Sequence, residues 1–389
     1  MIISHIVLKN WRNFRAVDVS LAERVFIVGP NASGKSNLLD VFRFLRDLAR
    51  SGGGLQEAVR LRGGVSKIRC LAARTQSDIE IEAHITDDSN KSVIWKYAIG
   101  FSQTGGGVFD VKAKLKYEKV WNEKDALILN RPNDEDKNDA KLLEYTHLEQ
   151  PTSNVNFREI AEFFQSIQYL HVIPQLLRAP AAFLKSNGHE DFYGRDFIEK
   201  INKTNIQTRK AFLKKINDAL KFAVPQFDDL DLIKDDMGVP HLEVLCKHWR
   251  PHAGKQREDQ FSDGTLRLVG LLWALLDGNK PILLEEPELS LHPGIVSKLA
   301  EVIARLQKRK TGRRQVIVTT HSYDLLANKG IGGDEVLMLI PTDEGTEVKP
   351  ADSDEEVKTL LNSGLSVADV VIPITTPKNI QQLSLQFEQ

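Results

Sequence analysis

Cysteine is nearly absent from this sequence of 389 residues. Cys70 and Cys246 lie far apart, and neither belongs to a CxxC pair or to a histidine-rich segment. This spacing argues against both a disulfide framework and a zinc site. We therefore expect a protein of a reducing, cytoplasmic compartment.

Long apolar runs and an excess of charge are also missing. No run of about 18 apolar residues occurs, so we expect neither a membrane-spanning helix nor a membrane partner. The first eleven residues, MIISHIVLKNW, alternate like a β-strand and lack the basic and apolar regions of a signal peptide. Because 52 Lys and Arg face 53 Asp and Glu, any contact with nucleic acid would need a local basic patch.

The chain is large enough for two or three average domains, or for one α/β unit that carries an insertion. Hydrophobic residues make up 41% of it, enough for a substantial core. No heptad pattern persists over three or four repeats, although residues 156–221 are mostly helical by pattern, so no coiled-coil arm is expected. The charged, turn-rich segment 131–141 is expected to be a mobile surface loop.

Alternating patterns in residues 79–121 predict a small antiparallel sheet with one face in water. Within it, Val111, Ala113, Leu115 and Tyr117 should face the core. The lysines at 112, 114 and 116 would then form a solvated stripe, with DNA contact as the alternative.

The segment FIVGPNASGKSNLLD, residues 26–40, separates a buried-strand pattern from a helical one by a glycine-containing loop. It fits the pattern G-x-x-x-x-G-K-[ST]. In such a loop the N–H groups point at one anion, and the helix N-terminus adds partial positive charge. We predict a P-loop in which Lys35 meets the β- and γ-phosphates and Ser36 binds Mg²⁺; an ordinary glycine-rich turn is the alternative. The expected nucleotide contacts are Gly29, Pro30, Asn31, Ala32, Ser33, Gly34, Lys35, Ser36 and Asn37.

After residue 255 helices and buried strands alternate strictly. TLRLVGLLWALLDG predicts a helix closed by Gly278, KPILLEE a strand, and the segment from Pro293 a helix with one apolar face. QVIVTTHS and DEVLMLIP predict further strands. This alternation indicates a largely parallel sheet whose ligand site lies at the C-terminal ends of its strands.

Two glutamates follow the apolar residues of ILLEEPE. A P-loop needs an acid on a neighbouring strand to hold Mg²⁺ and to orient the attacking water. Glu285, at the strand end, suits the metal, and Glu286 would be the base that activates water. The alternative is that the two glutamates only form a charged junction between a strand and a loop. The P-loop in the same chain argues for the catalytic role.

FSDGTLRL, LLEEPELSLHP and VTTHS follow one another with short gaps. With the P-loop they resemble the ABC-type ATPase heads of the SMC/RecF branch, especially the RecF-like and OLD-like AAA ATPases of DNA repair and phage defence. The resemblance implies an α/β fold, a P-loop NTPase of ABC-ATPase type with a mostly parallel core sheet, an antiparallel β lobe and a helical insertion. The head would comprise residues 1–78 and 255–389, and the lobe and insertion residues 79–254.

The resemblance assigns further residues by their motifs. Ser262 and Gly264 look like the signature motif, which contacts the γ-phosphate bound by the opposite protomer. Asp263 stands where transporter heads usually have Gly, which favours the SMC/RecF branch. His292 matches the D-loop, and His321 matches the histidine that senses the γ-phosphate.

Two assignments stay open. LKNWRNF is similar to the opening strand of the branch, in which an arginine reaches the nucleotide; Arg12 matches, and Arg15 is close. The Q-loop glutamine, a metal ligand of the family, has Gln56 and Gln76 as candidates.

The resemblance also implies that two chains bind head to tail around two ATP molecules. A homodimer or higher homo-oligomer is therefore expected, with Mg²⁺-dependent hydrolysis of ATP to ADP and phosphate. A sensor or scaffold that ATP holds together, with slow turnover, shares every motif and is the alternative.

The family couples ATP to an effector through coiled coils, a fused TOPRIM nuclease or a separate partner. Heptads are missing, and residues 322–389 are too few for a TOPRIM domain as the family carries it. We therefore expect a separate nuclease or toxin of a phage-defence system, with RecF-like DNA repair as the alternative. The basic run KRKTGRR, residues 308–314, is a further candidate for DNA contact.

Overall fold

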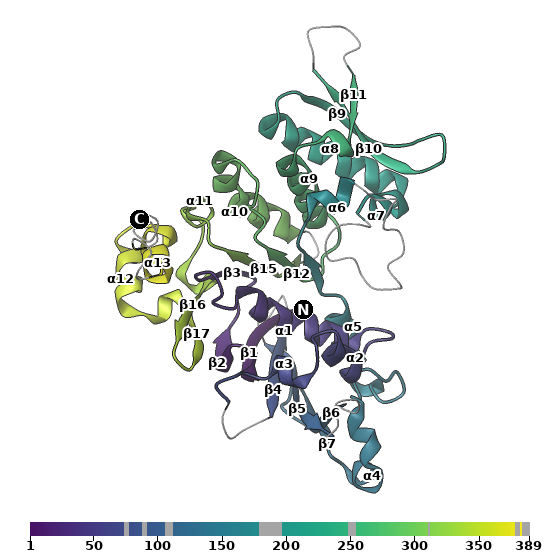
Figure 1. Cartoon of the computed structure of the whole chain (residues 1–389), viewed down its shortest axis with the longest axis vertical. Helices are drawn as coiled ribbons and strands as arrows, with labels where there is room; N and C mark the ends of the chain where they lie inside the picture. Colours follow the sequence, from purple (N-terminus) through teal and green to yellow (C-terminus); the bar gives the residue numbers. More distant parts are fainter. Residues whose placement is uncertain are drawn as a thin grey trace, which may run out of the picture. The chain divides into compact units, whose positions relative to one another are not determined.

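The computed structural model describes residues 1–73, 78–87, 92–105, 112–178, 197–247, 254–309, 312–377 and 382 (Figure 1). The chain divides into unit 1, Met1–Gln168, Lys280–Leu283 and Lys308–Gln389, and unit 2, Tyr169–Asn279 and Leu284–Gln307. The expected division into head and lobe at residues 78 and 254 stays a prediction. None of the helices in the described ranges has the length and apolar content that crossing a bilayer requires.

An antiparallel sheet of unit 1 has the strand order β2-β1-β4-β5-β6-β7. Its strands are β1 (Ile2–Trp11), β2 (Phe14–Ser20), β4 (Ile79–Thr86), β5 (Val93–Thr104), β6 (Lys112–Asn122) and β7 (Leu127–Arg131). The sheet expected in residues 79–121 is confirmed. It also includes the two N-terminal strands, which meet in a tight hairpin that pairs Trp11 with Phe14.

Strand β6 does not keep one buried face along its length. Ala113 and Leu115 are buried as the alternation predicts. The register with β5 then shifts between Leu115 and Tyr117, and such a bulge moves the alternation by one residue. Glu118 is therefore buried and Tyr117 half-buried, so the expected core position of Tyr117 was wrong.

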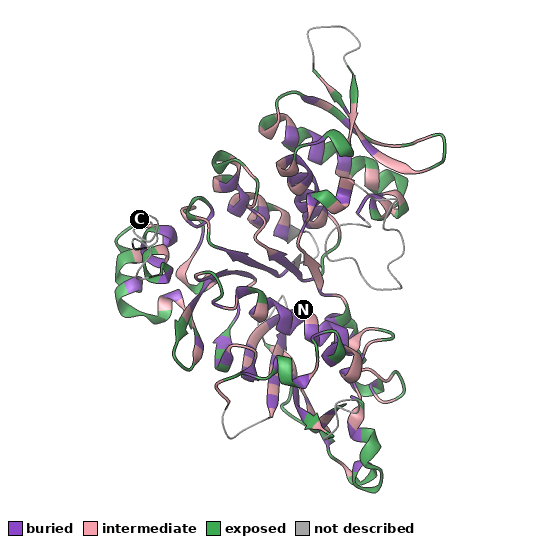
Figure 2. Cartoon of the chain, viewed as in Figure 1, coloured by how far each residue is buried: buried purple, intermediate pink, exposed green. Residues whose placement is uncertain are grey.

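A second sheet has the order β17-β16-β3-β15-β12-β8. Strand β3 runs parallel to β15 and to β16, whereas β17 is antiparallel to β16, which confirms the largely parallel sheet. Every residue of β3 and of β15 is buried (Figure 2). The strands are β3 (Arg24–Val28), β8 (Gln168–Leu170), β12 (Ile282–Glu285), β15 (Val316–Thr320), β16 (Val336–Thr342) and β17 (Gly345–Pro350).

The longest helix of unit 1, α1, follows β3 and buries Leu38, Phe42 and Leu45 at the predicted spacing. The helices of this unit are α1 (Lys35–Ala49), α2 (Leu55–Arg60), α3 (Val65–Ile68), α4 (Asp134–Asn138), α5 (Arg158–Gln165), α11 (Tyr323–Leu326), α12 (Glu355–Asn362) and α13 (Val367–Thr375). Two short strands, β13 (Lys308–Arg309) and β14 (Gly312–Arg313), form a hairpin.

The charged segment 131–141, expected to be a mobile loop, is folded around Arg131. Asn133 and Asp136 bond each other's backbone N–H groups in a reciprocal cap of helix α4. Arg131 is 2% exposed and donates to Glu118 at 3.0 Å and to Asp136 at 2.6 Å. The segment lies at the surface as expected, with Asp134 and Lys137 exposed, but it is not a loop, because Arg131 and Asp136 are buried and two carboxylates compensate the guanidinium.

Replacing Arg131 with alanine should lower the free energy of unfolding by about 3–5 kcal/mol. Burial raises the pKa of the Glu118 carboxyl, and the N–H of His147 and the charge of Arg131 oppose this rise. Without Arg131 a buried carboxylate loses its compensating charge. Urea unfolding tests this, with Arg15→Ala as the control because Arg15 pairs with Glu344 at the surface, where pairs contribute about 0–1 kcal/mol. Equal midpoints for the two variants would contradict the prediction.

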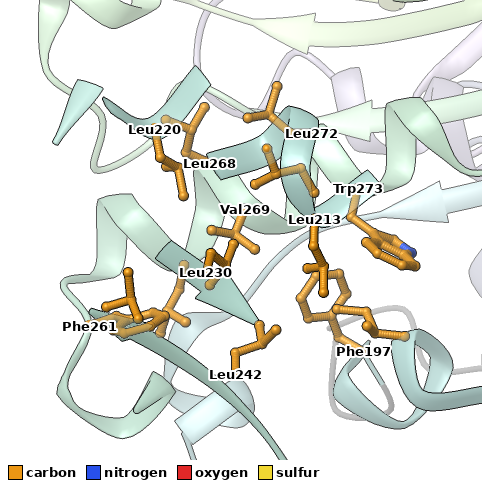
Figure 3. Packing of buried hydrophobic residues seen from close by; sticks show 14 of the residues in the cluster. Phe197, Leu213, Leu220, Leu230, Leu242, Phe261, Leu268, Val269, Leu272 and Trp273 are labelled. Atoms are coloured by element: carbon orange, nitrogen blue, oxygen red, sulfur yellow. The ribbon is translucent and has the colours of Figure 1, made fainter. Parts of the chain in front are cut away.

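Unit 2 is built around helix α9, whose apolar side chains lie among those of α7, α8, β9 and β10 (Figure 3). Its elements are α6 (Pro174–Arg178), α7 (Phe197–Lys203), α8 (Ile206–Ala223), β9 (Phe227–Lys234), β10 (Pro240–Cys246), β11 (Lys255–Arg257), α9 (Asp263–Leu276) and α10 (Pro293–Gln307). The helical insertion and the helix that Gly278 closes, at a φ of +80°, are confirmed.

Candidate functional site

The loop between β3 and α1, residues 29–34, has a compact backbone that requires glycine at two positions. Gly34 has a φ of +98°, and a Cβ there would lie 2.2 Å from the side chain of Asn13. A Cβ on Gly29 would lie 2.6 Å from the hydroxyl of Ser33. Larger residues cannot replace these glycines without moving the loop.

Lys35 directs its ammonium group back into this loop. Its Nζ donates to the carbonyl of Gly29 at 2.9 Å and to that of Pro30 at 3.2 Å, and the residue is only 7% exposed. Ser36, in the first turn of α1, is exposed. The buried hydroxyl of Ser33 lacks a hydrogen-bond partner among the described residues. A buried cation and a helix N-terminus together make this loop complementary to an anion.

Asn13 ties the loop to the N-terminal hairpin, a role that the sequence analysis missed. Its amide donates to the carbonyl of Ser33 at 2.7 Å and to the hydroxyl of Thr346 at 2.8 Å. Its oxygen accepts from the amide of Asn37 at 2.9 Å. Asn37 thus supports the loop through Asn13, and the position of Asn13 beside Arg12 in LKNWRNF was the only signal for this.

Arg12 adopts a left-handed backbone, with a φ of +50°, and its guanidinium lies 2.9 Å from Asp40 of α1. Arg62 also bonds Asp40, at 2.9 Å. Burial opposes ionisation of Asp40, but the arginines around it outweigh burial and lower its pKa. Arg15, the alternative to Arg12, forms an exposed pair with Glu344.

A hollow of about 1290 Å³ lies beside the loop, next to Asn13 and Asn37. Its cationic side chains are Lys9, Arg12, Arg15, Lys67 and Arg69. The acidic side chains that line it, Asp343 and Glu344, are fewer. Lys9, Arg12 and Arg15 also pair with Glu80, Asp40 and Glu344, so the lining is basic by a small excess.

His321 follows β15 at the edge of the sheet from which the loop begins. Thr320 of β15 pairs in parallel with Val28 of β3, so His321 and Gly29 are the next residues of neighbouring strands. Neighbouring strands lie about 4.8 Å apart, which brings His321 close to the start of the loop. His321 is exposed.

In unit 2, Ser262 is the N-cap of α9. Its hydroxyl accepts from the N–H of Thr265 at 3.2 Å, and the residue is exposed. A Cβ on Gly264 would lie 2.5 Å from the carbonyl of Ser290, so only glycine permits this approach. The two motifs SDG and SLH are therefore packed together.

Glu285 and Glu286 are both half-buried where β12 ends. Tyr169 of β8 donates its hydroxyl to the carboxylate of Glu285. Glu286 has a φ of +43°, so the chain turns sharply between the two acids. Sequence reasoning missed Tyr169, because only the sheet brings β8 and β12 together.

Arg267 and Glu288 are two further residues of this region that the sequence analysis did not single out. Glu288 is buried. Burial lowers the pKa of Arg267, and the carboxylates of Asp263, Glu286 and Glu288 oppose this shift, which places acids around the guanidinium. The only signal in the sequence was the third glutamate of EEPE.

Three other residues that the sequence singled out form hydrogen bonds with backbone groups of the chain itself. His292 caps helix α10, because its Nδ1 accepts from the N–H of Gly294 at 3.1 Å. Gln56 is fully engaged with the backbone of Ala113 and Glu144, which argues against a metal-ligand role, and Gln76 lies outside the described residues. Arg314 of the basic run is buried and donates to the carbonyl of Lys280.

The expected site residues thus form two sets. The P-loop, Arg12 and His321 belong to unit 1, whereas Ser262, Gly264, Glu285, Glu286 and His292 belong to unit 2.

Residues 24–327 match a protein family described as "AAA domain, putative AbiEii toxin, Type IV TA system". The chain is 27% identical over 179 residues to the Old nuclease of Escherichia phage P2, a match that covers 40% of this chain and 30% of that protein. It is 31% identical over 97 residues to the DNA replication and repair protein RecF of Lacticaseibacillus casei, covering 24% of this chain and 26% of RecF. The chain thus spans less than a third of each of these relatives.

Solved structures of SMC heads have a similar fold. The SMC head bound to the C-winged helix domain of ScpA has a TM-score of 0.54 at 14% identity, with 90% of this chain and 98% of that chain covered. The SMC head with an extended coiled coil, bound to the C-terminal domain of ScpA from Pyrococcus furiosus, has a TM-score of 0.50 at 13% identity. The match covers 93% of this chain and 99% of that chain. At such identity the likeness concerns the fold alone.

Proposed function

We propose that this chain hydrolyses ATP. The chain belongs to the AAA-domain family that matches residues 24–327, and it is an ABC-type ATPase head of the SMC/RecF/OLD branch. One observation carries the proposal. The ammonium of Lys35 is buried inside a glycine-dependent loop between a parallel strand and a helix N-terminus, where a polyphosphate is the fitting anion.

The side chains of the site divide the chemistry among them. The N–H groups of the loop and Lys35 bind the β- and γ-phosphates, and the basic hollow beside Asn13 receives the rest of the nucleotide. Glu286 takes the proton of the attacking water, and His321 donates a hydrogen bond to the γ-phosphate.

Ser36 and Glu285 would hold Mg²⁺, which neutralises charge on the phosphates when bound. Mg²⁺ in nucleotide sites needs only one or two protein oxygens, because phosphates and waters supply the rest. In the ranges that the structure describes, no group of three or more His, Cys, Asp and Glu that could hold a metal occurs.

The composite site of the family is part of the proposal. Two chains would bind head to tail in the cytoplasm, and Ser262, Gly264 and His292 of one chain would contact the ATP held by the other. The exposed position of Ser262 at the N-terminus of α9 supports this, since a helix N-terminus favours a phosphate.

Ser262→Arg tests the composite site. The variant should bind ATP normally, because the P-loop is unchanged, but lose ATP-dependent dimerisation and at least about tenfold in turnover, since a long side chain occupies the place of a phosphate contact. The change also removes a helix cap, at about 1 kcal/mol. Ser366→Arg is the matched control, because Ser366 caps α13 in the same way and should cost stability without costing turnover.

Mixing gives the sharper form of this experiment. In a dimer of Ser262→Arg and Lys35→Ala chains, one composite site keeps its own Lys35 and its partner's Ser262, while the other site carries both defects. Some turnover should return on mixing. Normal turnover of Ser262→Arg alone would contradict the proposal and leave Ser262 as a helix cap.

The effector of this ATPase is proposed to be a separate protein, a nuclease or toxin of a phage-defence system, with RecF-like DNA repair as the alternative. Similarity to the Old nuclease of a phage supports the first proposal, and similarity to the DNA repair protein RecF supports the alternative. Direct DNA contact by the lysine stripe is less favoured, because Lys112 pairs with Glu144 at 2.9 Å. Turnover measured with and without DNA separates a DNA-stimulated enzyme from a slow ATP-held scaffold.

A further inference from the structure

We infer that Asn13 is a positioning residue for the nucleotide, because it orients the peptide bond between Ser33 and Gly34 in the P-loop. Through Asn13, strand β17 also contributes to nucleotide binding. The inference rests on the proposed function, in which the P-loop binds the phosphates of ATP. All the residues that carry it belong to unit 1.

Two residues around this peptide bond have a left-handed backbone. Ala32 has a φ of +63° and Gly34 a φ of +98°. Ala32 carries a Cβ, which makes the left-handed conformation unfavourable for it. A backbone of this kind keeps one conformation only where surrounding contacts hold it.

Asn13 supplies one of these contacts. Its Nδ2 donates to the carbonyl of Ser33 at 2.7 Å. The bond between Ser33 and Gly34 is trans, so this carbonyl and the N–H of Gly34 point in opposite directions. The N–H of Gly34 therefore points away from Asn13, and it has no acceptor in the part of the chain that the structure describes. Such an N–H, at the N-terminus of a helix, is a donor for a phosphate oxygen.

The side chain of Asn13 is itself fixed from two further sides. Its Nδ2 also donates to the hydroxyl of Thr346 in β17 at 2.8 Å, and its Oδ1 accepts from Asn37 at 2.9 Å. The N–H of Thr346 donates in turn to the carbonyl of Asn13 at 2.8 Å. Because both donors and the acceptor of the amide are used, the side chain can face only one way.

Glycine on β17 lets this strand approach the β1–β2 hairpin, beside which it lies in Figure 1. A Cβ on Gly345 would lie 2.6 Å from the carbonyl of Asn13. Thr346, the next residue, is only 6% exposed. Contacts this close leave Asn13 little room to move, so β17 braces the P-loop through it.

This brace prepares the P-loop before a nucleotide arrives. A loop whose Gly34 N–H already faces the phosphate spends no binding free energy on turning the peptide. Without Asn13 the peptide can turn, and only the fraction of molecules in the original conformation binds well. The loss should then appear in affinity and not in the turnover of the bound complex.

Asn13→Ala tests this role. The variant should bind both ATP and inorganic tripolyphosphate about tenfold more weakly, a factor that corresponds to the loss of one good hydrogen bond. Its kcat at saturating ATP should stay within about twofold of the wild type. Tripolyphosphate probes the loop without base or ribose, and calorimetry measures both affinities.

A pair of variants at Thr346 tests the contribution of β17. Thr346→Val loses the hydroxyl and should weaken both affinities by about threefold, whereas Thr346→Ser keeps the hydroxyl and should bind like the wild type. Independent effects of Asn13→Ala and Thr346→Val would multiply to about thirtyfold. Because Thr346 acts through Asn13, the double variant should lose only about tenfold.

Asn154→Ala is the matched control for the loss of a part-buried asparagine. Asn154 is 5% exposed and donates to the carbonyl of Leu148 at 3.0 Å, far along the chain from the P-loop. This variant should have a lower unfolding midpoint but wild-type affinity for ATP and for tripolyphosphate.

The outcomes separate the inference from the proposed function. A folded Asn13→Ala protein with wild-type affinity for tripolyphosphate, or with its loss in kcat alone, would overturn the role of Asn13 and leave the ATPase proposal standing. A thirtyfold loss in the double variant would overturn the contribution of β17 through Asn13. A wild-type protein that binds neither ATP nor tripolyphosphate would overturn both the inference and the proposed function.

Discussion

Lys35→Ala is expected to weaken ATP binding by at least about a hundredfold, which corresponds to about 2.7 kcal/mol. The wild-type ammonium is already buried and held by two loop carbonyls, so it needs little reorganisation to reach the phosphates. Its removal leaves a polyphosphate with loop N–H groups as its main partners. Hydrogen bonds to charged groups contribute about 1.5–3 kcal/mol each, and Lys35 offers a full charge in addition.

Titration with a fluorescent ATP analogue measures this loss. Lys298→Ala is the matched control, because Lys298 is an exposed lysine that pairs with Glu301 on α10. Because Lys35→Ala also removes the two contacts to loop carbonyls, circular dichroism spectra and unfolding midpoints of the variant and the wild type should be compared first. A folded Lys35→Ala protein with wild-type affinity would exclude the P-loop as the nucleotide site.

Glu286→Gln is expected to reduce ATP turnover by about 10²- to 10⁴-fold, the range that general bases contribute. Glutamine has the same size and fits the left-handed backbone at this position no worse than glutamate does, so the fold should be unchanged. It cannot accept the proton of the attacking water. ATP should therefore bind without being hydrolysed, and ATP-held dimers should accumulate, which light scattering with and without ATP can measure.

Glu285→Gln separates the roles of the two acids. That variant should need more Mg²⁺ for half-maximal turnover, because an amide oxygen is a weaker ligand than a carboxylate. Its oxygen still accepts a bond from Tyr169, so the position of the side chain is kept. Normal turnover of Glu286→Gln would reassign the base to Glu285 or to Glu288.

The elements that the sequence determined depend on neighbours along the chain. Glycines, Lys35 and Ser36 at fixed spacing define the loop, and the apolar periods on either side define β3 and α1. Likewise, Gly278 closes α9, and Pro293 begins α10. In each case the physical cause, a backbone preference or a repeating apolar face, acts within about fifteen residues and can be recognised without the fold.

The tertiary structure alone decided what the polar side chains do. Arg131 looks like part of a solvated charge run, yet it lies buried beside a carboxylate that a bulge in β6 turns inward. Tyr169 reaches Glu285 across a sheet from more than a hundred residues away. A polar side chain can be satisfied by water, by backbone or by a distant partner at similar free energy, so its sequence neighbours do not determine which partner it finds. Packing makes that choice, because only the folded chain removes the water.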